Sequence, residues 1–288
     1  MGCRSLSLLR CKSCNTVYLA DRYESFDNSL YDYYEKFRNL PKNSVFDSLT
    51  ASSYLKVLDL LAVNTAGKTI IDVGCGMGGF VDISLANGWQ AEGLELAVAA
   101  VEIAQSFGLP VRRIDFLSGM VKNDSADIVT MFEVIEHLVE PATFLKRAEM
   151  VVRPGGLVYL TTPNFNSMDR RILGKKWRVF HREHLTYFTP STLLSMIHHN
   201  TDLEVLHFET RNLSNELVQY FKGMTRMVFS GHGGSIAART SEASVQADLR
   251  TAIERSHWLS LVKRVINSLL DATSLGSTVV MLLRRPVK

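Results

Sequence analysis

The middle of the chain alternates between two kinds of hydrophobic pattern. From residue 69 onward, short apolar runs are followed by stretches whose apolar residues recur at helical spacing. The apolar runs predict seven strands, at 69–74, 90–96, 111–115, 126–133, 157–162, 203–210 and 276–285. Strands that alternate with helices are typical of βαβ units, which form a parallel sheet with right-handed crossovers.

Helical spacing of apolar residues predicts the connecting helices. These helices lie at 54–62, 78–87, 97–107, 141–152 and 190–199. Glycine and proline end three of them, with Gly88 after the second, Gly108 and Pro110 after the third, and Pro154 after the fourth.

Two regions depart from this alternation, and they set the expected domain boundaries. We divide the chain into an N-terminal extension, residues 1–50, and a main domain, residues 51–288. The extension contains a small cysteine ribbon followed by an aromatic segment that we expect to be helical. Within the main domain, residues 212–275 are predicted to form a helical insertion because they lack strand signals.

Composition places the chain among globular proteins. Hydrophobic residues make up 46% and charged residues 21% of the sequence, which excludes intrinsic disorder, collagen and a disulfide scaffold. The formal net charge of +3 is too small to indicate nucleic-acid binding by itself. No uncharged apolar run reaches the roughly 18 residues of a membrane span.

The N-terminus and the cysteines favour a cytoplasmic protein. The apolar run at 5–9 is too short for a signal peptide, and Leu6 stands where a myristoylation motif has Ser or Thr. The cysteines are Cys3, Cys11, Cys14 and Cys75. Because three of the four crowd one end, they do not form a disulfide framework. Only Cys11 and Cys14 make a complete pair, and a closed zinc site needs four ligands, so we expect a degraded ribbon without zinc.

The clearest chemical signal is the run from Ile70 to Phe80, where a predicted strand leads through a glycine turn into a helix. Glycines let the backbone approach a ligand closely, and the amide groups at a helix N-terminus face it. Gly74, Gly76 and Gly79 satisfy the G-x-G-x-x-G pattern, so a dinucleotide is one candidate ligand. Glu95 ends the next strand, where an acid binds ribose hydroxyl groups.

Asp72 separates the two cofactor classes that need such a turn. It lies two residues before Gly74, at the carboxyl end of the strand. A carboxylate there would repel a pyrophosphate by several kcal/mol at an effective dielectric constant of about 20. S-Adenosylmethionine carries an ammonium and a sulfonium instead of a phosphate, so the sequence favours that cofactor over NAD.

Several motifs together resemble the class I S-adenosylmethionine-dependent methyltransferases. The run Asp72-Val73-Gly74-Cys75-Gly76-Met77-Gly78 resembles their motif I. Glu95 and Asp115-Phe116 are similar to the acidic motifs after strands two and three, and 127–138 and 153–157 are similar to the later motifs. The resemblance covers residues 52–210 and extends to the last strand, 276–285.

The resemblance implies an α/β, Rossmann-like fold with a seven-stranded, mostly parallel sheet, helices on both faces and an antiparallel last strand. It implies S-adenosylmethionine as cofactor and S-adenosylhomocysteine as product. The cofactor-binding residues that it implies are Asp72, Gly74, Cys75, Gly76, Glu95, Leu96, Asp115, Phe116, Phe132 and Glu133.

The run Glu183-His184-Leu185-Thr186-Tyr187-Phe188-Thr189 is similar to a stretch of the subfamily that contains ubiquinone-type O-methyltransferases and natural-product and sugar methyltransferases. In that subfamily the segment corresponding to 166–200 covers the acceptor. The expected function is therefore O-methylation of a small biosynthetic intermediate, such as a sugar, a nucleotide-linked sugar or a phenol. N- and C-methylation stay open, and the oligomeric state is a monomer or a homodimer.

Methyl transfer requires alignment of the acceptor with the methyl group, and a hydroxyl acceptor also needs a base. Glu133, Glu136 and His137 follow the fourth strand of the sheet and are the candidates near the acceptor. We assign His137 and His184 as catalytic, since an imidazole titrates near neutral pH. The alternative is that His137 only bonds to the backbone at a helix start.

Glu133, Glu136, His137 and His184 also resemble the divalent-metal site of ubiquinone O-methyltransferases and of small-RNA 2′-O-methyltransferases. A metal would lower the pKa of the acceptor hydroxyl. The same residues occur in this superfamily without a metal, so metal dependence is an alternative that we do not favour.

The segment 166–189 is basic and aromatic. Its cationic residues are Arg170, Arg171, Lys175, Lys176, Arg178 and Arg182. They suit a phosphate-bearing acceptor or an anionic membrane surface, and Trp177 and Phe180 could stack on RNA bases. The alternative is a solvated basic loop whose aromatic residues belong to the core. Three other functions stay open: an RNA 2′-O-methyltransferase, an NAD-dependent oxidoreductase, and a cofactor-binding partner protein without activity.

Overall fold

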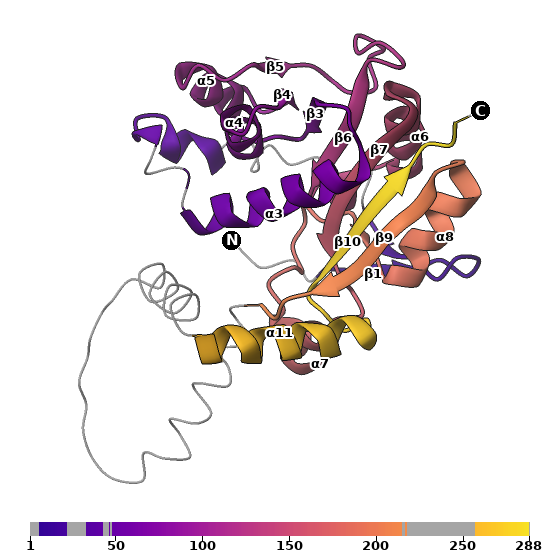
Figure 1. Cartoon of the computed structure of the whole chain (residues 1–288). Helices are drawn as coiled ribbons and strands as arrows, with labels where there is room; N and C mark the ends of the chain where they lie inside the picture. The colour runs from indigo at the N-terminus through magenta and orange to yellow at the C-terminus, as the bar shows by residue number, and fades with distance from the viewer. Residues whose placement is uncertain are drawn as a thin grey trace, which may run out of the picture.

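The computed structural model describes residues 6–21, 33–42, 46, 48–214, 217 and 257–287 of the chain. Cys3, the first part of the aromatic segment and most of the predicted helical insertion lie outside these residues. Figure 1 shows the main sheet with helices packed against it.

The main sheet has seven strands in the order β5-β4-β3-β6-β7-β10-β9. The strands are β3 (Thr69–Val73), β4 (Gln90–Glu95), β5 (Val111–Arg113), β6 (Ala126–Phe132), β7 (Val152–Pro163), β9 (Glu204–Arg211) and β10 (Thr278–Arg284). Strand β10 is antiparallel to both β7 and β9, and the pairs among β3 to β7 are parallel. The predicted fold class and the antiparallel last strand are therefore confirmed.

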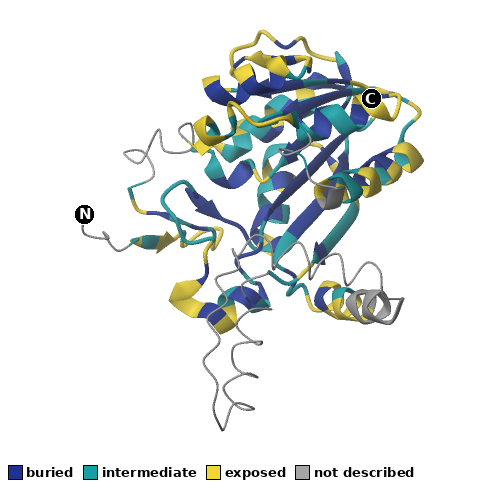
Figure 2. Cartoon of the chain, turned by 90° about the vertical axis from the view of Figure 1, so that its left-hand side faces the viewer, coloured by how far each residue is buried: buried dark blue, intermediate teal, exposed yellow. Residues whose placement is uncertain are grey.

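Helices cover both faces of this sheet because the central strands are apolar on both sides. Figure 2 shows these central strands as buried. The helices are α3 (Ser48–Asn64), α4 (Gly79–Ala86), α5 (Val98–Ser106), α6 (Pro141–Val151), α7 (Met168–Leu173), α8 (Pro190–Asn200) and α11 (His257–Ala272), with 3-10 turns η1 (Tyr34–Phe37), η2 (Ile135–His137) and η3 (Gly174–Lys176). One core lies under α3 and α4, around Leu61 and Phe80. The other lies under α6 and α8, around Leu145 and Leu193.

Two elements are longer than the sequence pattern predicts. Strand β7 begins at Val152, so it contains the Arg-Pro-Gly-Gly run that the sequence pattern predicts only as the stop of the preceding helix. Gly155 has φ +78°, which lets the strand bend there while its amide still donates to the Arg285 carbonyl. Helix α3 begins at Ser48 rather than Tyr54, because its first turn has too few apolar residues to reveal a period.

A second, three-stranded sheet joins the N-terminal extension to the segment after β7. It contains β1 (Leu8–Arg10), β2 (Val17–Leu19) and β8 (Thr186–Tyr187) in that order. Val17 pairs with Tyr187, and both are buried in a small core with Phe165 and Trp177. The N-terminal ribbon is therefore fixed against the segment 166–189.

None of the helices among the described residues is both long and apolar enough to cross a lipid bilayer.

Candidate functional site

A pocket of about 290 Å³ lies at the carboxyl ends of β3, β4 and β6. The chain runs from β3 to β4 on one side and continues to β6 on the other, and parallel sheets bind ligands where the strand order reverses in this way. The lining residues that the sequence predicted are Gly74, Glu95, Leu96, Asp115, Phe116, Phe132, Glu133 and His137. Asp72, Cys75, Gly76 and His184 are not among the lining residues.

The glycines of the turn are required for two reasons: the backbone conformation, and the lack of room for a Cβ atom. Gly74 has φ +67°, and a Cβ there would lie 2.6 Å from the Val134 side chain. Gly78 has φ +82° at the start of α4, and a Cβ there would lie 2.9 Å from the Leu109 side chain. A left-handed residue with no room for a side chain must be glycine, so the turn can bring its backbone to the pocket.

Glu95 organises the backbone around this turn. Its Oε2 atom accepts a hydrogen bond of 2.9 Å from the Gly76 amide, and its Oε1 atom accepts from the amides of Leu96 and Ala97 at 2.7 and 2.9 Å. The carboxylate therefore connects the glycine turn to the end of β4. Oε1 uses both of its lone pairs on these amides, whereas Oε2 keeps one with which it could accept a ligand hydroxyl group.

Asp72 points away from the ligand space, contrary to the electrostatic role that we expected for it. Its side chain is 2% exposed, and Oδ1 accepts a hydrogen bond of 2.6 Å from the Thr130 hydroxyl. Burial raises the pKa of Asp72 to about 7, against the Thr130 hydrogen bond, which lowers it. The physical reason is that successive side chains of a strand point to opposite faces, and position 72 faces into the protein.

Cys75 also turns into the protein. A Cβ on Gly93 would meet the Cys75 sulfur at 2.4 Å, so the thiol fills the space that this glycine leaves. Burial raises the pKa of the thiol far above its usual range. Only the backbone of Cys75 can therefore take part in the binding that we predicted.

At the other end of the pocket, Asp115 and Phe116 follow β5. Asp115 is exposed, and its Oδ1 atom accepts a hydrogen bond from the Leu117 amide at 2.9 Å. Phe116 is buried, and its ring centroid lies 5.9 Å from that of Phe144. An apolar wall beside an open carboxylate suits the face and the amino group of a purine.

Glu133 has an unusual backbone at the end of β6. Its φ is +53°, which non-glycine residues rarely adopt and which is common at functional sites. Its amide donates to the carbonyl and the hydroxyl oxygen of Thr161, which hold this conformation. The residue is exposed where it lines the pocket. The pKa of Glu133 is raised to about 7. Desolvation raises it by more than the Thr161 hydrogen bond and the Arg211 charge lower it.

Tyr34 comes from the N-terminal extension and completes the pocket, which the sequence did not reveal. A Cβ on Gly76 would lie 3.1 Å from the Tyr34 hydroxyl, so the ring lies against the glycine turn. Two ion pairs fasten this segment, from Arg38 to Glu102 on α5 and from Lys42 to Asp82 on α4. The other lining residues that we did not predict are Val73, Leu94, Ile114, Val134, Leu138, Phe144, Glu183 and Leu185. Most of them are apolar and carry no chemical signal in the sequence.

His137 and His184 lie together, with ring centroids 4.6 Å apart. Nδ1 of His137 lies 2.9 Å from the Glu183 carbonyl oxygen, and Nδ1 of His184 lies 2.9 Å from the Val179 carbonyl oxygen. A carbonyl only accepts, so each Nδ1 carries the proton and each Nε2 has a free lone pair. His137 lines the pocket, whereas His184 is 7% exposed and lies behind it.

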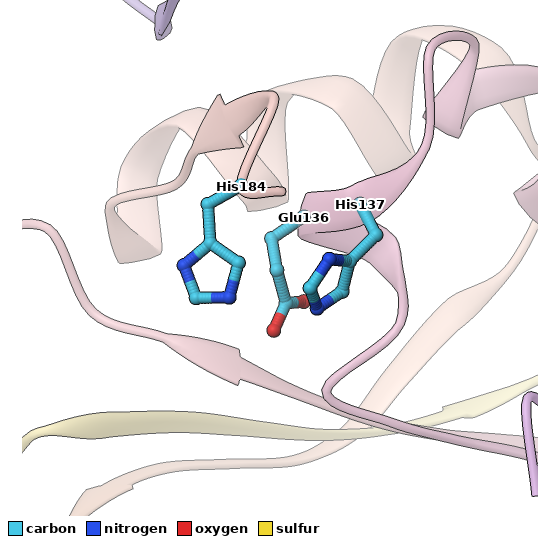
Figure 3. Close-up of side chains that lie close together, drawn as sticks. All are labelled: Glu136, His137 and His184. Carbon is cyan, nitrogen blue, oxygen red and sulfur yellow. The ribbon is translucent and has the colours of Figure 1, made fainter. Parts of the chain in front are cut away.

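Glu136 completes a group of three possible metal ligands with these histidines (Figure 3). One ligand atom from each residue lies within 4.8 Å of the others. Glu136 Oε2 accepts from the Thr162 hydroxyl at 2.9 Å, while its buried Oε1 has no hydrogen-bond partner among the described residues. An orphaned carboxylate oxygen beside two imidazole lone pairs fits a divalent ion such as Zn²⁺. Glu133, the fourth ligand that we considered, is not in this group.

The basic segment is anchored to the protein through its aromatic residues. Trp177 is 4% exposed, and its ring packs against Phe165 and Phe180. The Arg170 guanidinium lies over the Phe165 ring, 4.4 Å from its centroid. Trp177 therefore belongs to the core, and its ring is not available to stack on an RNA base.

Comparison with known proteins identifies relatives of the central region. A family model described as "Methyltransferase domain" matches residues 48–208. A ubiquinone biosynthesis O-methyltransferase of Proteus mirabilis is 29% identical over 157 residues, which are 51% of this chain and 60% of that protein. The corresponding protein of Bordetella pertussis is 34% identical over 113 residues, 36% of this chain and 46% of that protein. The chain thus spans about half the length of these relatives.

Solved structures share the fold over more of the chain. A SAM-dependent methyltransferase from Archaeoglobus fulgidus superposes with a TM-score of 0.55 at 14% identity, covering 88% of this chain and 99% of that one. A possible histamine N-methyltransferase from Thermotoga maritima has a TM-score of 0.52 at 15% identity, covering 92% and 99%. At these identities the likeness concerns the fold alone.

Proposed function

Because the chain belongs to the class I S-adenosylmethionine-dependent methyltransferases, we propose that its pocket binds this cofactor and that it methylates a hydroxyl group of a small molecule. The observation that supports this most is the charge of the pocket wall. Glu95, Asp115, Glu133 and Glu183 line the pocket, and among its described lining residues none is Lys or Arg. Such a wall attracts a cation and repels a diphosphate.

The residues fit the parts of the cofactor. Glu95 would accept a hydrogen bond from a ribose hydroxyl group, and Asp115 with Phe116 would hold the adenine. Glu133 would face the positive charge near the reacting end, where a cation would lower its raised pKa. When bound, S-adenosylmethionine supplies a methyl group that is activated by its sulfonium.

His137 would remove the proton of the acceptor hydroxyl. It lines the pocket, and its Nε2 atom has a free lone pair because Nδ1 donates to the Glu183 carbonyl. Burial lowers the pKa of His137 below its usual value, so the imidazole is neutral and able to accept a proton at pH 7. His184 is buried beside it and would keep the ring in place.

A second candidate mechanism uses a divalent ion on Glu136, His137 and His184. The observation that favours it is the orphaned Oε1 atom of the buried Glu136 carboxyl group. A bound ion would lower the pKa of the acceptor hydroxyl and would replace the imidazole as the activating group. The same site is the basis for the alternative of an RNA 2′-O-methyltransferase, which the burial of Trp177 disfavours.

The test is transfer of a labelled methyl group from S-adenosylmethionine to the small-molecule fraction of a cell extract, with identification of the product by mass spectrometry. We expect the full chain to label a product in which the new methyl group is on oxygen. His137→Ala should lose most of the turnover while its affinity for S-adenosylhomocysteine is unchanged. Binding of NAD in preference to S-adenosylhomocysteine would overturn the proposal.

Removal of metal separates the two mechanisms. If His137 acts as the base, dialysis against a chelator leaves the rate unchanged. If an ion activates the acceptor, dialysis abolishes the rate, and added Zn²⁺, Mn²⁺ or Mg²⁺ restores it. In that case His184→Ala should be as inactive as His137→Ala, since both are ligands.

A further inference from the structure

A second cavity, of about 340 Å³, lies where β9 ends between helices α3 and α11. Every described residue that lines it is polar or charged, and they include Ser53 and Lys56 of α3 and Asn267 of α11. Helix α11 packs along the end of β9 (Figure 1). Side-chain hydrogen bonds hold this end in place, since Asn267 Oδ1 accepts from the Asn212 amide at 3.2 Å and Asp271 Oδ1 accepts from the Thr210 amide at 2.8 Å.

The cavity wall carries two cations, Lys56 and Arg211, and two acids, Glu209 and Asp271, and only Arg211 and Glu209 form an ion pair. Glu209 lies 3.3 Å from the Arg211 guanidinium and 3.8 Å from the His207 ring nitrogen. The Asp271 carboxylate accepts a hydrogen bond from the Thr210 amide, as described above. No acid within the described part of the chain pairs with the Lys56 ammonium, which leaves it available to an anionic group of a ligand.

The cavity and the cofactor pocket share no lining residue, but a chain of side-chain contacts connects them. Arg211 lines the cavity and donates a hydrogen bond of 3.3 Å to the hydroxyl of Tyr159, which is buried. The Tyr159 ring lies 5.3 Å from that of Phe132, which lines the cofactor pocket beside Glu133. The charge of Arg211 also lowers the pKa of Glu133, which lines that pocket.

We propose that this cavity binds the non-reacting part of the acceptor, and that this part is a sugar that carries an anionic group, a phosphate or a carboxylate. The proposal rests on the proposed function, since it supplies a substrate class for the same reaction. The sugar hydroxyls would bond to the amides and hydroxyls of the wall, and the anion would bind Lys56.

The chemistry of the wall separates this class from the other acceptors that the sequence left open. A phenol or a prenylated quinone needs apolar or aromatic side chains around it, and none of the described lining residues of this cavity is apolar or aromatic. A sugar offers hydroxyl groups that both donate and accept. The wall has both kinds of partner, in Asn212, Asn267 and Ser268.

The test is saturation-transfer NMR and calorimetry on the full chain in the presence of S-adenosylhomocysteine. The probes are glucose 1-phosphate and glucuronate, compared with glucose, inorganic phosphate and catechol. We expect at least one of the two anionic sugars to bind more tightly than all three comparison compounds. Which of them binds identifies the anionic group.

Two variants locate the binding. Lys56→Met keeps the stem of the side chain and should weaken binding of the anionic sugar about tenfold, as expected for loss of one hydrogen bond to a charged group. Ser268→Phe would place a ring in the cavity and should abolish binding. Lys146→Met changes an exposed lysine on α6 and is the matched control, with unchanged binding expected.

Three results would overturn the proposal: neither anionic sugar binds, catechol binds most tightly, or Lys56→Met and Lys146→Met bind alike. Titration of S-adenosylhomocysteine alone tests the proposed function separately. If that cofactor product does not bind but an anionic sugar binds in a manner that depends on Lys56, the proposed function and the acceptor role of the cavity both fail, and only a sugar-binding site remains.

Discussion

The Asp72 carboxyl group accepts a hydrogen bond of 2.6 Å from the Thr130 hydroxyl, across the neighbouring strands β3 and β6. The two residues are register partners in the parallel pair, so the bond is fixed by the sheet itself. The acid of the glycine motif therefore supports the sheet beneath the pocket. The negative wall of the pocket comes from Glu95, Asp115, Glu133 and Glu183 instead.

Thr130→Val removes the donor and leaves a buried carboxyl group without it. We expect a loss of about 1–3 kcal/mol in the free energy of unfolding, the cost of an unsatisfied buried polar group. The pKa of Asp72 is already raised to about 7, and losing the bond raises it further. A carboxyl group whose pKa is higher in the folded than in the unfolded state makes the fold less stable as the pH rises. The loss of stability caused by Thr130→Val should therefore be larger at pH 8 than at pH 6.

Urea unfolding at both pH values measures this difference. Asp72→Asn provides the control, because an amide keeps an acceptor oxygen but does not ionise. In that background, the effect of Thr130→Val should be the same at pH 6 and pH 8. A pH-dependent effect that persists would show that another group is responsible.

Glu95→Gln should weaken binding of S-adenosylhomocysteine at least tenfold. The Glu95 carboxylate accepts three backbone amides, and the amide group of Gln would place N–H groups against one of them. A tenfold loss corresponds to about 1.4 kcal/mol, within the range for a hydrogen bond to a charged group. Glu92→Gln, on the same strand but paired with Arg112 at the surface, is the matched control for calorimetry.

Tyr34→Ala should weaken cofactor binding roughly tenfold, because aromatic side chains that cover a buried ligand contribute strongly to affinity. Tyr34→Phe should bind almost as the wild type does, since the ring against Gly76 is kept. Calorimetric titration of S-adenosylhomocysteine distinguishes them. Equal affinities for all three proteins would mean that the N-terminal segment does not close the pocket.

His184 should make the protein less stable in acid. Burial lowers the pKa of His184 to about 2 from an ordinary value of 6.5, so between these values the unfolded chain binds a proton that the folded chain does not. The contribution of His184 to the free energy of unfolding is therefore fully present above pH 6.5 and decreases as the pH falls below that value. At 1.36 kcal/mol per pH unit, the loss between pH 7 and pH 5 is about 2 kcal/mol.

The carboxyl groups nearby act in the opposite direction, so a difference between variants is needed. Desolvation raises the pKa values of Glu133 and Glu136, and carboxyl groups of this kind make the folded protein less stable as the pH rises. His184→Asn keeps a donor for the Val179 carbonyl but does not titrate in this range. With chelator present, wild type minus His184→Asn should give the slope of the histidine alone, and equal slopes would contradict the assignment.

The residues of the cofactor pocket differ in how readily the sequence reveals them. Glu95 and Asp115 end strands that the hydrophobic pattern predicts, and strand ends in a parallel sheet meet at one edge. Tyr34 and Phe144 give no such signal, because an aromatic residue in a helix or turn has the same pattern whether it fills a core or a ligand site. Asp72 shows the converse, since the motif gives its position but not the direction of its side chain.

Local rules determined the seven strands, their alternation with helices and the positive-φ glycine turn, because periodicity and backbone conformation depend on residues close together in the chain. Only the tertiary structure decided which residues from distant parts of the sequence contact one another. It paired the N-terminal ribbon with Tyr187, brought Glu136, His137 and His184 together, and placed Arg211 in the wall of a polar cavity with Lys56. These contacts join segments far apart in the sequence, and such pairs are selected by packing of the whole chain, which no local pattern records.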